Sequence, residues 1–508
     1  MLTPEKSFEV ACAGLARGKQ PDPCIVVIFG ASGDLTRREL IPSLYALSCQ
    51  GLLPDPFAVI GFARTEWGDQ TFRAEMYETV RNHKVFRADR WQRFAQCLYY
   101  VHGDYAGEQA HAALRQKIQE VQTDGFSADN ILFHLSVPPH LYGGILERLA
   151  TGPLASGGGG WRRVIIEKPF GRDAASARAL DRQILQAFAE EQIYHIDHYL
   201  GKETVQNMLV FRFANAGFEP IWNRNYIDHI QITGAESRGI GTRGEFYENT
   251  GVVRDMVQNH LLQLLCLTAI EPPVRYDAVS LRTETVKVLE ALVPVGLQTD
   301  CVLGQYGAGH IENKMVGAYR EEDHVAADSK TPTFVALKLS LDNWRWAGVP
   351  FYLRTGKRLP RKLTEVTVHF KPTPHLMFPI ARNERLLSNV LTFRLQPDEG
   401  ILYTFLAKQP GVDFCLQPVK MNFCYDTAFG IEAPPSAYEW LLLDAMHGDQ
   451  TLFPHSEWIH RAWSIVDPII EHAESQPATN FPNYAAGTWG PAEADAMIRR
   501  DGREWTIV

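Results

Sequence analysis

Residues 25–36, with the sequence IVVIFGASGDLT, decide the fold of the first part of this 508-residue chain. Five apolar residues, most of them β-branched, predict a short buried strand. The strand runs directly into a turn of mostly small residues, which are Gly30, Ala31, Ser32, Gly33, Asp34 and Leu35. A helix-length segment follows the turn. The stretch therefore predicts a strand–turn–helix unit.

Such a turn has a physical use. A glycine at the strand end allows a tight turn, and a second glycine lets the backbone approach a pyrophosphate group. The helix that follows offers unpaired N–H groups and a partial positive charge at its N-terminus. We expect a dinucleotide to bind here; a plain strand–helix turn with small residues is the alternative. A P-loop is excluded, because no Gly-Lys-Ser/Thr follows at the required spacing.

The first two hundred residues alternate short β-rich apolar runs with helix-length segments. These runs lack strict alternation, as do strands that are covered on both faces. Strands separated by helices imply right-handed crossovers and a parallel, doubly wound sheet. The expected strands are 25–29, 58–62, 98–102, 131–137, 164–166 and 193–196.

The pattern changes after about residue 200. Segments with alternating apolar and polar residues predict antiparallel strands, and helical stretches lie among them. The strand segments include 333–341, 365–370, 390–395 and 401–407, and the helical ones include 251–270 and 437–447. We therefore expect a dinucleotide-binding domain over residues 1–200, whose residues 1–20 are an N-terminal extension, and an α+β domain over residues 201–508.

Charge and composition exclude several classes of protein. The net charge of −9 would repel nucleic acid and anionic membranes, so an anionic substrate needs a local cluster of cations. No run approaches the roughly 18 apolar residues of a membrane span. The eight cysteines are scattered without a CxxC pair, which favours free thiols in a reducing compartment. We expect a cytoplasmic protein.

The end of the second expected strand indicates which dinucleotide binds. Domains that bind NAD usually have a carboxylate side chain there, whereas this chain has Arg64 and Thr65. Arg64 can form a bidentate contact with a 2′-phosphate, and Thr65 can donate its hydroxyl. These residues favour NADP. Glu66 leaves some use of NAD open, and an ordinary solvent-exposed arginine is the alternative interpretation.

Several segments together resemble the glucose-6-phosphate dehydrogenase family. The resemblance spans essentially the whole chain in order, and DHYLGKE within it is highly specific. The segments are GASGDLTRREL (30–40), GFARTEW (61–67), EKPFG (167–171), HIDHYLGKETVQN (195–207), RFAN (212–215), FEPIWNRNYID (218–228), RDMVQNHLLQLL (254–265), NWRWAGVPFYLRTGKRL (343–359) and AGTWGP (486–491).

The resemblance implies an oxidoreductase that oxidises glucose 6-phosphate to 6-phosphogluconolactone and reduces NADP+, the first step of the oxidative pentose phosphate pathway. It implies a Rossmann-like N-terminal domain and a larger β+α domain with a mainly antiparallel sheet. It also implies a substrate held between the two domains, and a homodimer or a dimer-based homotetramer. No metal is expected, because no His/Cys cluster has the spacing of ligands.

The resemblance also assigns the acid–base residues. His260 in RDMVQNH matches the general base of the family, and Asp197 in IDHYLGK matches the carboxylate that orients it. Histidine suits this role, because its pKa lies near working pH. Without the resemblance, His260 would be interpreted as a core histidine, since it shares one apolar helical stripe with Val253, Met256 and Leu264.

The remaining expected site residues hold the substrate. His198, Tyr199 and Lys202 match the phosphate-binding residues of the family, and all three carry suitable donors. Lys357 and Lys362 resemble basic residues that reach the substrate from the second domain; alone they would suggest a solvated basic turn. The sugar-binding carboxylates are expected to be Glu236 and Asp255. Lys168 resembles a lysine that lies near both substrate and nicotinamide.

Two positions depart from the family pattern. His195 stands where arginine usually precedes IDHYLGK, which removes a permanent cation. Glu39 stands where many members carry a basic residue, and Arg37 or Arg38 is expected to compensate. Neither change removes a residue needed for proton or hydride transfer.

Two other functions remain open from the sequence. A sugar dehydrogenase similar to glucose–fructose oxidoreductase shares an EKP segment and a histidine base, but such enzymes lack DHYLGKE. A catalytically silent NADPH-sensing protein is the second alternative, and the presence of His260, Asp197 and Lys168 argues against it.

Overall fold

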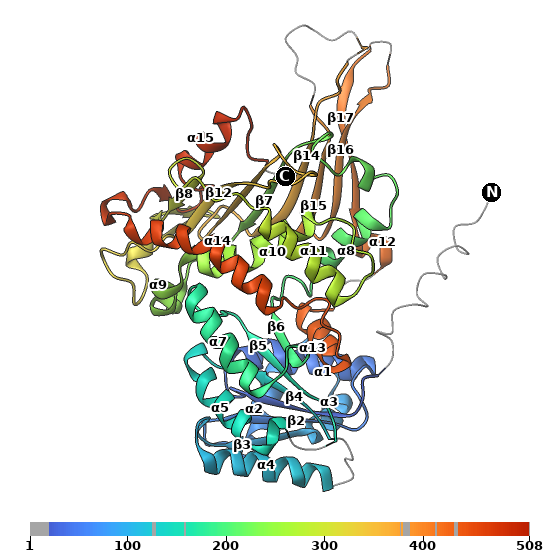
Figure 1. The fold of residues 1–508 in the computed structure, drawn as a ribbon, viewed down its shortest axis with the longest axis vertical. Coiled ribbons are helices and arrows are strands. Elements are labelled where there is room, and N and C mark those ends of the chain that lie inside the picture. Colours follow the sequence, from blue (N-terminus) through green and yellow to red (C-terminus); the bar gives the residue numbers. More distant parts are fainter. Residues whose placement is uncertain are drawn as a thin grey trace, which may run out of the picture. The chain divides into compact units, whose positions relative to one another are not determined.

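The computed structural model describes residues 20–123, 129–156, 159–375, 377–378, 387–411, 414–430 and 435–506 (Figure 1). Of the predicted N-terminal extension, only Gln20 lies within these ranges. The chain folds into two compact units. The first comprises the described residues within Met1–Gly171, Arg178–Gly201 and Pro435–His455, and the second those within Arg172–Ala177, Lys202–Pro434 and Ser456–Val508.

The first unit contains the parallel sheet that the sequence predicts. Its order is β3-β2-β1-β4-β5-β6, and every neighbouring pair is parallel. The order reverses between β1 and β4, which is the point where a doubly wound sheet opens a crevice at the carboxyl ends of its strands. The strands are β1 (Cys24–Phe29), β2 (Phe57–Ala63), β3 (Leu98–His102), β4 (Asn130–Leu135), β5 (Arg162–Glu167) and β6 (Ile193–Ile196).

Helices connect these strands, as right-handed crossovers require. They are α1 (Ile41–Gln50), α2 (Asp69–Val80), α3 (Ala88–Gln96), α4 (Glu108–Thr123), α5 (Tyr142–Thr151), α6 (Pro153–Ser156) and α7 (Ala174–Ala187), with a π-helical turn η3 (Thr36–Leu40) before α1. All residues of β1 and β2 are buried, which explains why their sequences lack alternation.

The second unit contains a mixed, mainly antiparallel sheet. Its order is β17-β16-β15-β14-β7-β13-β12-β8, and the only parallel pair in this described sheet is β7 with β13. The strands are β7 (Ile227–Ala235), β8 (Cys301–Gly304), β12 (Phe334–Ser340), β13 (Pro350–Gly356), β14 (Leu363–Phe370), β15 (Val390–Gln396), β16 (Gly400–Lys408) and β17 (Leu416–Cys424).

Helices pack along this sheet, and Figure 1 shows α8, α10, α11 and α14 together on one side of it. The helices of the second unit are α8 (Glu203–Phe213), α9 (Gly244–Val252), the π-helical η8 (Val253–Leu261), α10 (Leu262–Ala269), α11 (Ala278–Glu290), α12 (Tyr425–Phe429), α14 (Ser456–Ser475) and α15 (Ala492–Arg500). The helix expected over 251–270 is observed as η8 and α10. The chain is not helical at the first expected residue, because Gly251 has a φ of 63° and a ψ of 171°. Among the described residues, no helix combines the length and hydropathy that crossing a membrane requires.

A segment from late in the chain belongs to the first unit. It carries the expected helix at 437–447, observed as α13 (Ala437–His447). The Arg163 guanidinium donates to the carbonyl oxygens of Ala445 (2.9 Å) and Met446 (2.6 Å), which satisfies groups that a helix leaves unpaired at its C-terminus. The two units are thus not the continuous ranges 1–200 and 201–508. Residues 435–455 belong to the first unit, and residues 172–177 belong to the second.

Candidate active site

The turn after β1 has the geometry that a phosphate-binding backbone needs. Gly30 has a φ of 88°, and a Cβ atom there would lie 2.0 Å from the carbonyl oxygen of Ser136, so only glycine fits. The turn closes through the Gly33 N–H, which donates to the Gly30 carbonyl at 2.9 Å. The Thr36 hydroxyl donates to the same carbonyl at 3.1 Å. These two hydrogen bonds to the Gly30 carbonyl hold the turn in a tight conformation.

The end of β2 meets this turn. The Gly30 N–H donates to the Phe62 carbonyl at 2.9 Å, and the Thr65 hydroxyl donates to the Ser32 hydroxyl at 2.8 Å. Arg64 is exposed, and its guanidinium lies 5.7 Å from the centre of the Tyr105 ring. One arginine and two hydroxyls thus stand at the carboxyl ends of neighbouring strands, a set of donors that can bind a phosphate group.

The other residues of the turn have local roles. Ala31 is buried opposite Gly61, where a Cβ would lie 2.8 Å from that of Ala31. Asp34 forms an exposed ion pair with Arg38 at 2.7 Å. Leu35 is half-buried where the following helix begins. Ala31 thus packs against β2, and Asp34 contacts the helix that follows the turn.

Lys168 and Asp197 follow neighbouring parallel strands. Glu167 at the end of β5 pairs in register with Ile196 at the end of β6, so the next residue of each strand lies at the same edge of the sheet. Lys168 is half-buried, and the peptide bond to Pro169 is cis. The structure thus brings two sequence-predicted site residues together within the first unit.

The turn that begins at Asp197 is ordered by its own side chains. Asp197 is 1% exposed, and its Oδ1 accepts from the Tyr199 N–H at 3.0 Å. The rings of His198 and Tyr199 lie 5.1 Å apart at a steep angle. A buried carboxylate that accepts a backbone N–H is fixed in direction, which suits a residue that orients a partner. Lys202 lies a few residues further on, at the N-cap of α8.

The second unit gathers three predicted residues that are far apart in sequence. Because β7 and β13 are parallel, their carboxyl ends lie at the same edge, and Glu236 and Lys357 each follow one of them. Lys357 is 3% exposed and its Nζ forms ion pairs with Glu236 and, at 3.2 Å, with Asp255 of η8. The Tyr247 ring lies 5.2 Å from the same ammonium. Nothing in the sequence pattern indicated Tyr247.

The electrostatics of this cluster keep the lysine charged. Burial acts to lower the pKa of Lys357, but the carboxylates of Asp255 and Glu236 outweigh it and raise the pKa above its ordinary value. One buried cation therefore balances part of the charge of two partly exposed carboxylates. Oxygen atoms that are held in this way can accept hydrogen bonds from the hydroxyl groups of a ligand.

His260 lies on the same helix as Asp255. It is 1% exposed, and its backbone N–H donates to the Asn259 side chain at 2.6 Å. Residues five apart differ by about 140° around an α-helix. The π-helical pattern of η8 is wider, with hydrogen bonds from residue i to i+5, and it brings Asp255 and His260 closer to one face. The periodicity of the sequence did not indicate this pattern.

Three further residues that the sequence singled out are Lys362 and the two departures from the family pattern, His195 and Glu39. Lys362 is exposed on the loop between β13 and β14. His195, one of the two departures from the family pattern, is 3% exposed and packs edge-on against Phe170 at 4.9 Å, so it is a core residue of β6. Burial raises the pKa of Glu39, Arg38 lowers it and Asp34 raises it further.

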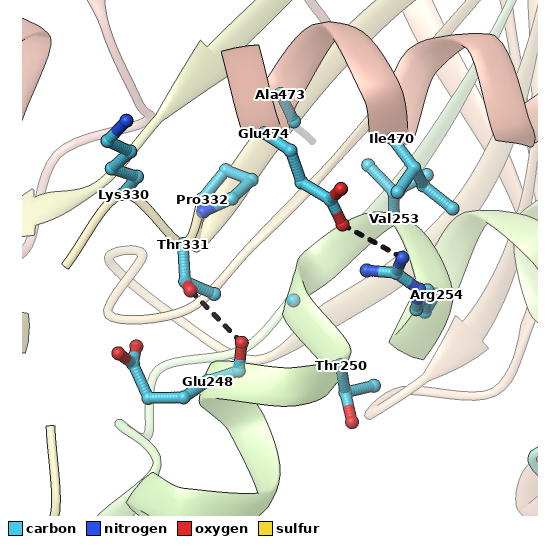
Figure 2. A pocket seen from close by; sticks show the side chains of 11 residues that line it. Glu248, Thr250, Val253, Arg254, Lys330, Thr331, Pro332, Ile470, Ala473 and Glu474 are labelled. Carbon is cyan, nitrogen blue, oxygen red and sulfur yellow. Dashed lines mark hydrogen bonds and ion pairs between the residues drawn. The ribbon is translucent and has the colours of Figure 1, made fainter. Parts of the chain in front are cut away.

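A cavity of about 150 Å³ lies at the start of η8 (Figure 2). Figure 2 shows Arg254 of η8 reaching Glu474 of α14, with a distance of 3.0 Å between their charged atoms, and the Thr331 hydroxyl bonded to the Glu248 carbonyl at 3.2 Å. The Val252 N–H also donates to Pro332 at 3.1 Å. These contacts surround the Gly251 break and fix where the helix with Asp255 and His260 begins.

Comparison with known proteins identifies the family to which the chain is similar in two consecutive ranges. Residues 27–207 match the family model "Glucose-6-phosphate dehydrogenase, NAD binding domain", and residues 209–506 match "Glucose-6-phosphate dehydrogenase, C-terminal domain". The glucose-6-phosphate 1-dehydrogenase of Aggregatibacter actinomycetemcomitans is 48% identical over 95% of this chain and 97% of its own length. That of Chlamydia pneumoniae is 44% identical, with 97% and 98% of the two chains covered.

Solved structures are similar over the same extent. A glucose-6-phosphate dehydrogenase in complex with its substrate glucose-6-phosphate has a TM-score of 0.88 and 31% identity, covering 96% of this chain and all of that chain. The glucose-6-phosphate 1-dehydrogenase of Mycobacterium avium has a TM-score of 0.80 and 34% identity, covering 96% of this chain and 99% of that one.

Proposed function

The chain belongs to the glucose-6-phosphate dehydrogenase family, and from this membership we propose that it oxidises D-glucose 6-phosphate to 6-phospho-D-glucono-1,5-lactone with NADP+ as the hydride acceptor. This is the first step of the oxidative pentose phosphate pathway. The observation that carries the proposal is the likeness, over the whole chain, to a dehydrogenase whose structure holds glucose 6-phosphate.

The proton is removed by a histidine in this proposal. His260 takes the proton of the C1 hydroxyl, and Asp197 accepts a hydrogen bond from the other ring nitrogen and stabilises the imidazolium that forms. His260 belongs to the second unit and Asp197 to the first, so their pairing is part of the proposal. Bound NADP+ supplies the acceptor for the hydride that leaves C1.

The other residues hold the substrate. His198, Tyr199 and Lys202 bind the phosphate group as donors, and Lys362 adds positive charge from its exposed loop. Lys168 lies next to Asp197 and directs its ammonium toward substrate and nicotinamide. These roles rest on the family match of each residue.

The buried ion-pair cluster refines the expected role of Lys357. In this proposal Lys357 acts chiefly through Glu236 and Asp255, because its ammonium already contacts both carboxylates. The cation fixes the direction of these groups, and their remaining lone pairs accept from the sugar hydroxyls. Lys357 is thus a support for sugar recognition as well as a positive charge near the substrate.

The dinucleotide is proposed to bind at the turn after β1, because this glycine turn stands where the strand order of the parallel sheet reverses and a short helical segment follows it. The preference for NADP over NAD rests on Arg64, Thr65 and Ser32 at the place where the 2′-phosphate would bind. Glu66, exposed next to them, leaves some use of NAD open.

We also propose a homodimer or a dimer-based homotetramer, and a cytoplasmic location. The cysteines of the described residues, which exclude Cys12, are all free thiols, in agreement with a reducing compartment.

Initial-rate kinetics test the activity. The purified protein is assayed for NADPH absorbance with glucose 6-phosphate and with free glucose, each with NADP+ and with NAD+. We expect kcat/KM for the phosphorylated sugar to exceed that for glucose by orders of magnitude, since free glucose leaves the phosphate donors unpaired. Equal values for both sugars would favour the glucose–fructose-oxidoreductase alternative, and no turnover with either would favour an NADPH sensor.

A further inference from the structure

The residue before Lys168 is a buried acid that the mechanism above does not use. Glu167 ends β5, and 8% of the residue is exposed. Its register partner Ile196 precedes Asp197, so Glu167 is the last residue of its strand before the edge of the sheet where Lys168 and Asp197 emerge. A change in the position of Glu167 would be transmitted to Lys168 through a single peptide unit.

The side chain of Tyr438, from a distant part of the sequence, contacts this carboxyl group. The Tyr438 hydroxyl lies 3.1 Å from Oε1 and 3.3 Å from Oε2 of Glu167. The Nε2 atom of His134, on the adjacent strand β4, lies 3.5 Å from Oε1. The backbone is held as well, because the Tyr142 hydroxyl of α5 donates to the Glu167 carbonyl at 3.1 Å. Each neighbouring element thus fixes the end of β5.

The position of Tyr438 is itself well determined. It is the second residue of α13, whose N-cap Ser436 accepts from the Glu439 N–H, while the Glu439 side chain accepts from the Ser436 N–H at 2.9 Å. The cap is tied to α1 by Gln50, which donates to Glu439 at 2.9 Å. A Cβ at Gly201 would lie 2.6 Å from the Ala437 carbonyl, so the turn after Asp197 also packs against the start of α13.

The protonation state of the acid follows from its surroundings. Burial raises the pKa of Glu167 to about 8; the Tyr438 hydrogen bond and Lys168 lower it, and Glu39 and Asp197 raise it. Burial also lowers the pKa of His134 to about 3, so that ring stays neutral. At neutral pH Glu167, the residue before Lys168, is therefore a neutral carboxylic acid.

We propose that Glu167 and Tyr438 form a positioning pair for Lys168, in which the buried acid–phenol contact fixes the end of β5 so that the lysine projects beside Asp197. The pair acts through Lys168 and does not touch the substrate. The proposal rests on the proposed function, since Lys168 has its role only in that reaction.

The first test compares two substitutions of the acid. Glu167→Gln keeps the shape and the neutral state, so we expect kcat/KM for glucose 6-phosphate close to wild type at about pH 7. Glu167→Ala removes the contact, and we expect a loss on the order of tenfold to a hundredfold, mostly in kcat. Tyr438→Phe should fall between them. Wild-type activity of Glu167→Ala, or equal losses for Gln and Ala, would overturn the proposal.

A double-mutant cycle separates positioning from general destabilisation. If Glu167 acts through Lys168, then Glu167→Ala should cost little further activity in a Lys168→Gln background. Losses that multiply would show that the residue supports the fold only. Glu365→Gln is the control, because Glu365 is also a buried acid, with a pKa raised to about 7 by burial, but lies on β14 of the other unit. This control should keep wild-type kcat/KM; a loss equal to that of Glu167→Ala would overturn the proposal.

The same measurements distinguish failure of this proposal from failure of the proposed function. Wild-type protein without activity on glucose 6-phosphate would refute the function itself. Active wild type with a multiplicative cycle would refute only the positioning pair.

Discussion

Replacement of Lys357 by methionine tests the buried cluster of the second unit most sharply. The change keeps most of the side-chain volume but removes the ammonium that contacts Glu236 and Asp255. Lys357 is 3% exposed, so its partners would lose a buried counter-charge. The two carboxylates that remain are partly exposed, so the loss of stability is expected to be about 1–3 kcal/mol, below the cost of leaving a charge fully buried. Because the folded-state pKa of Lys357 is raised, its stabilising contribution is fully present below about pH 10.5 and is lost only above it.

The assay is urea unfolding of Lys357→Met at neutral pH, with Lys362→Met as the matched control. Lys362 is exposed five residues further on, and its removal should change the free energy of unfolding by less than about 0.5 kcal/mol. The KM for glucose 6-phosphate should rise in Lys357→Met as well, since Glu236 and Asp255 lose their fixed direction. A Lys357→Met protein as stable as Lys362→Met, with an unchanged KM, would refute the buried-cluster reasoning.

Three further predictions follow from single positions. Arg64→Ala should raise the KM for NADP far more than that for NAD, because only NADP carries the 2′-phosphate; equal changes would remove the basis for NADP preference. Gly251→Ala should lower the free energy of unfolding by about 1–3 kcal/mol, since a φ of 63° with a ψ of 171° is a glycine conformation; urea unfolding with unchanged stability would contradict this. Glu167→Gln should remove a pH dependence of stability. In the folded wild type Glu167 keeps its proton up to about pH 8, whereas in the unfolded chain it loses the proton near pH 4.5. The free energy of unfolding of the wild type should therefore fall by up to about 1.4 kcal/mol per pH unit between these two pH values. Parallel pH profiles for the two proteins would contradict the raised pKa.

The sequence predicted the parts of the fold that depend on local pattern. The strand over 25–29 and its turn could be recognised because apolar β-branched residues and Gly30 act over a few positions. The helix at 437–447 was predicted for the same reason, but not that it packs in the first unit. That packing depends on contacts such as Arg163 with Met446, which lie hundreds of residues apart.

The geometry of the site depended on features that leave no local signal. The contact of Glu236 with Lys357 requires β7 and β13 to be parallel in a sheet that is otherwise antiparallel, and no periodicity distinguishes these alternatives. The π-helical form of η8 was likewise hidden, because Asp255 and His260 fit an ordinary amphipathic helix in sequence. Their roles came from the resemblance to a family, and Tyr438 had no signal of either kind.

The pairing of His260 with Asp197 is the central claim, and a double-mutant cycle on kcat tests it most directly. His260→Ala should lower kcat by several orders of magnitude to a small residual rate, while binding of glucose 6-phosphate, measured by calorimetry, stays close to wild type. If the two residues act as one unit, His260→Ala combined with Asp197→Asn should be no slower than His260→Ala alone. Losses that multiply, or loss of sugar binding with normal turnover in His260→Ala, would contradict the mechanism.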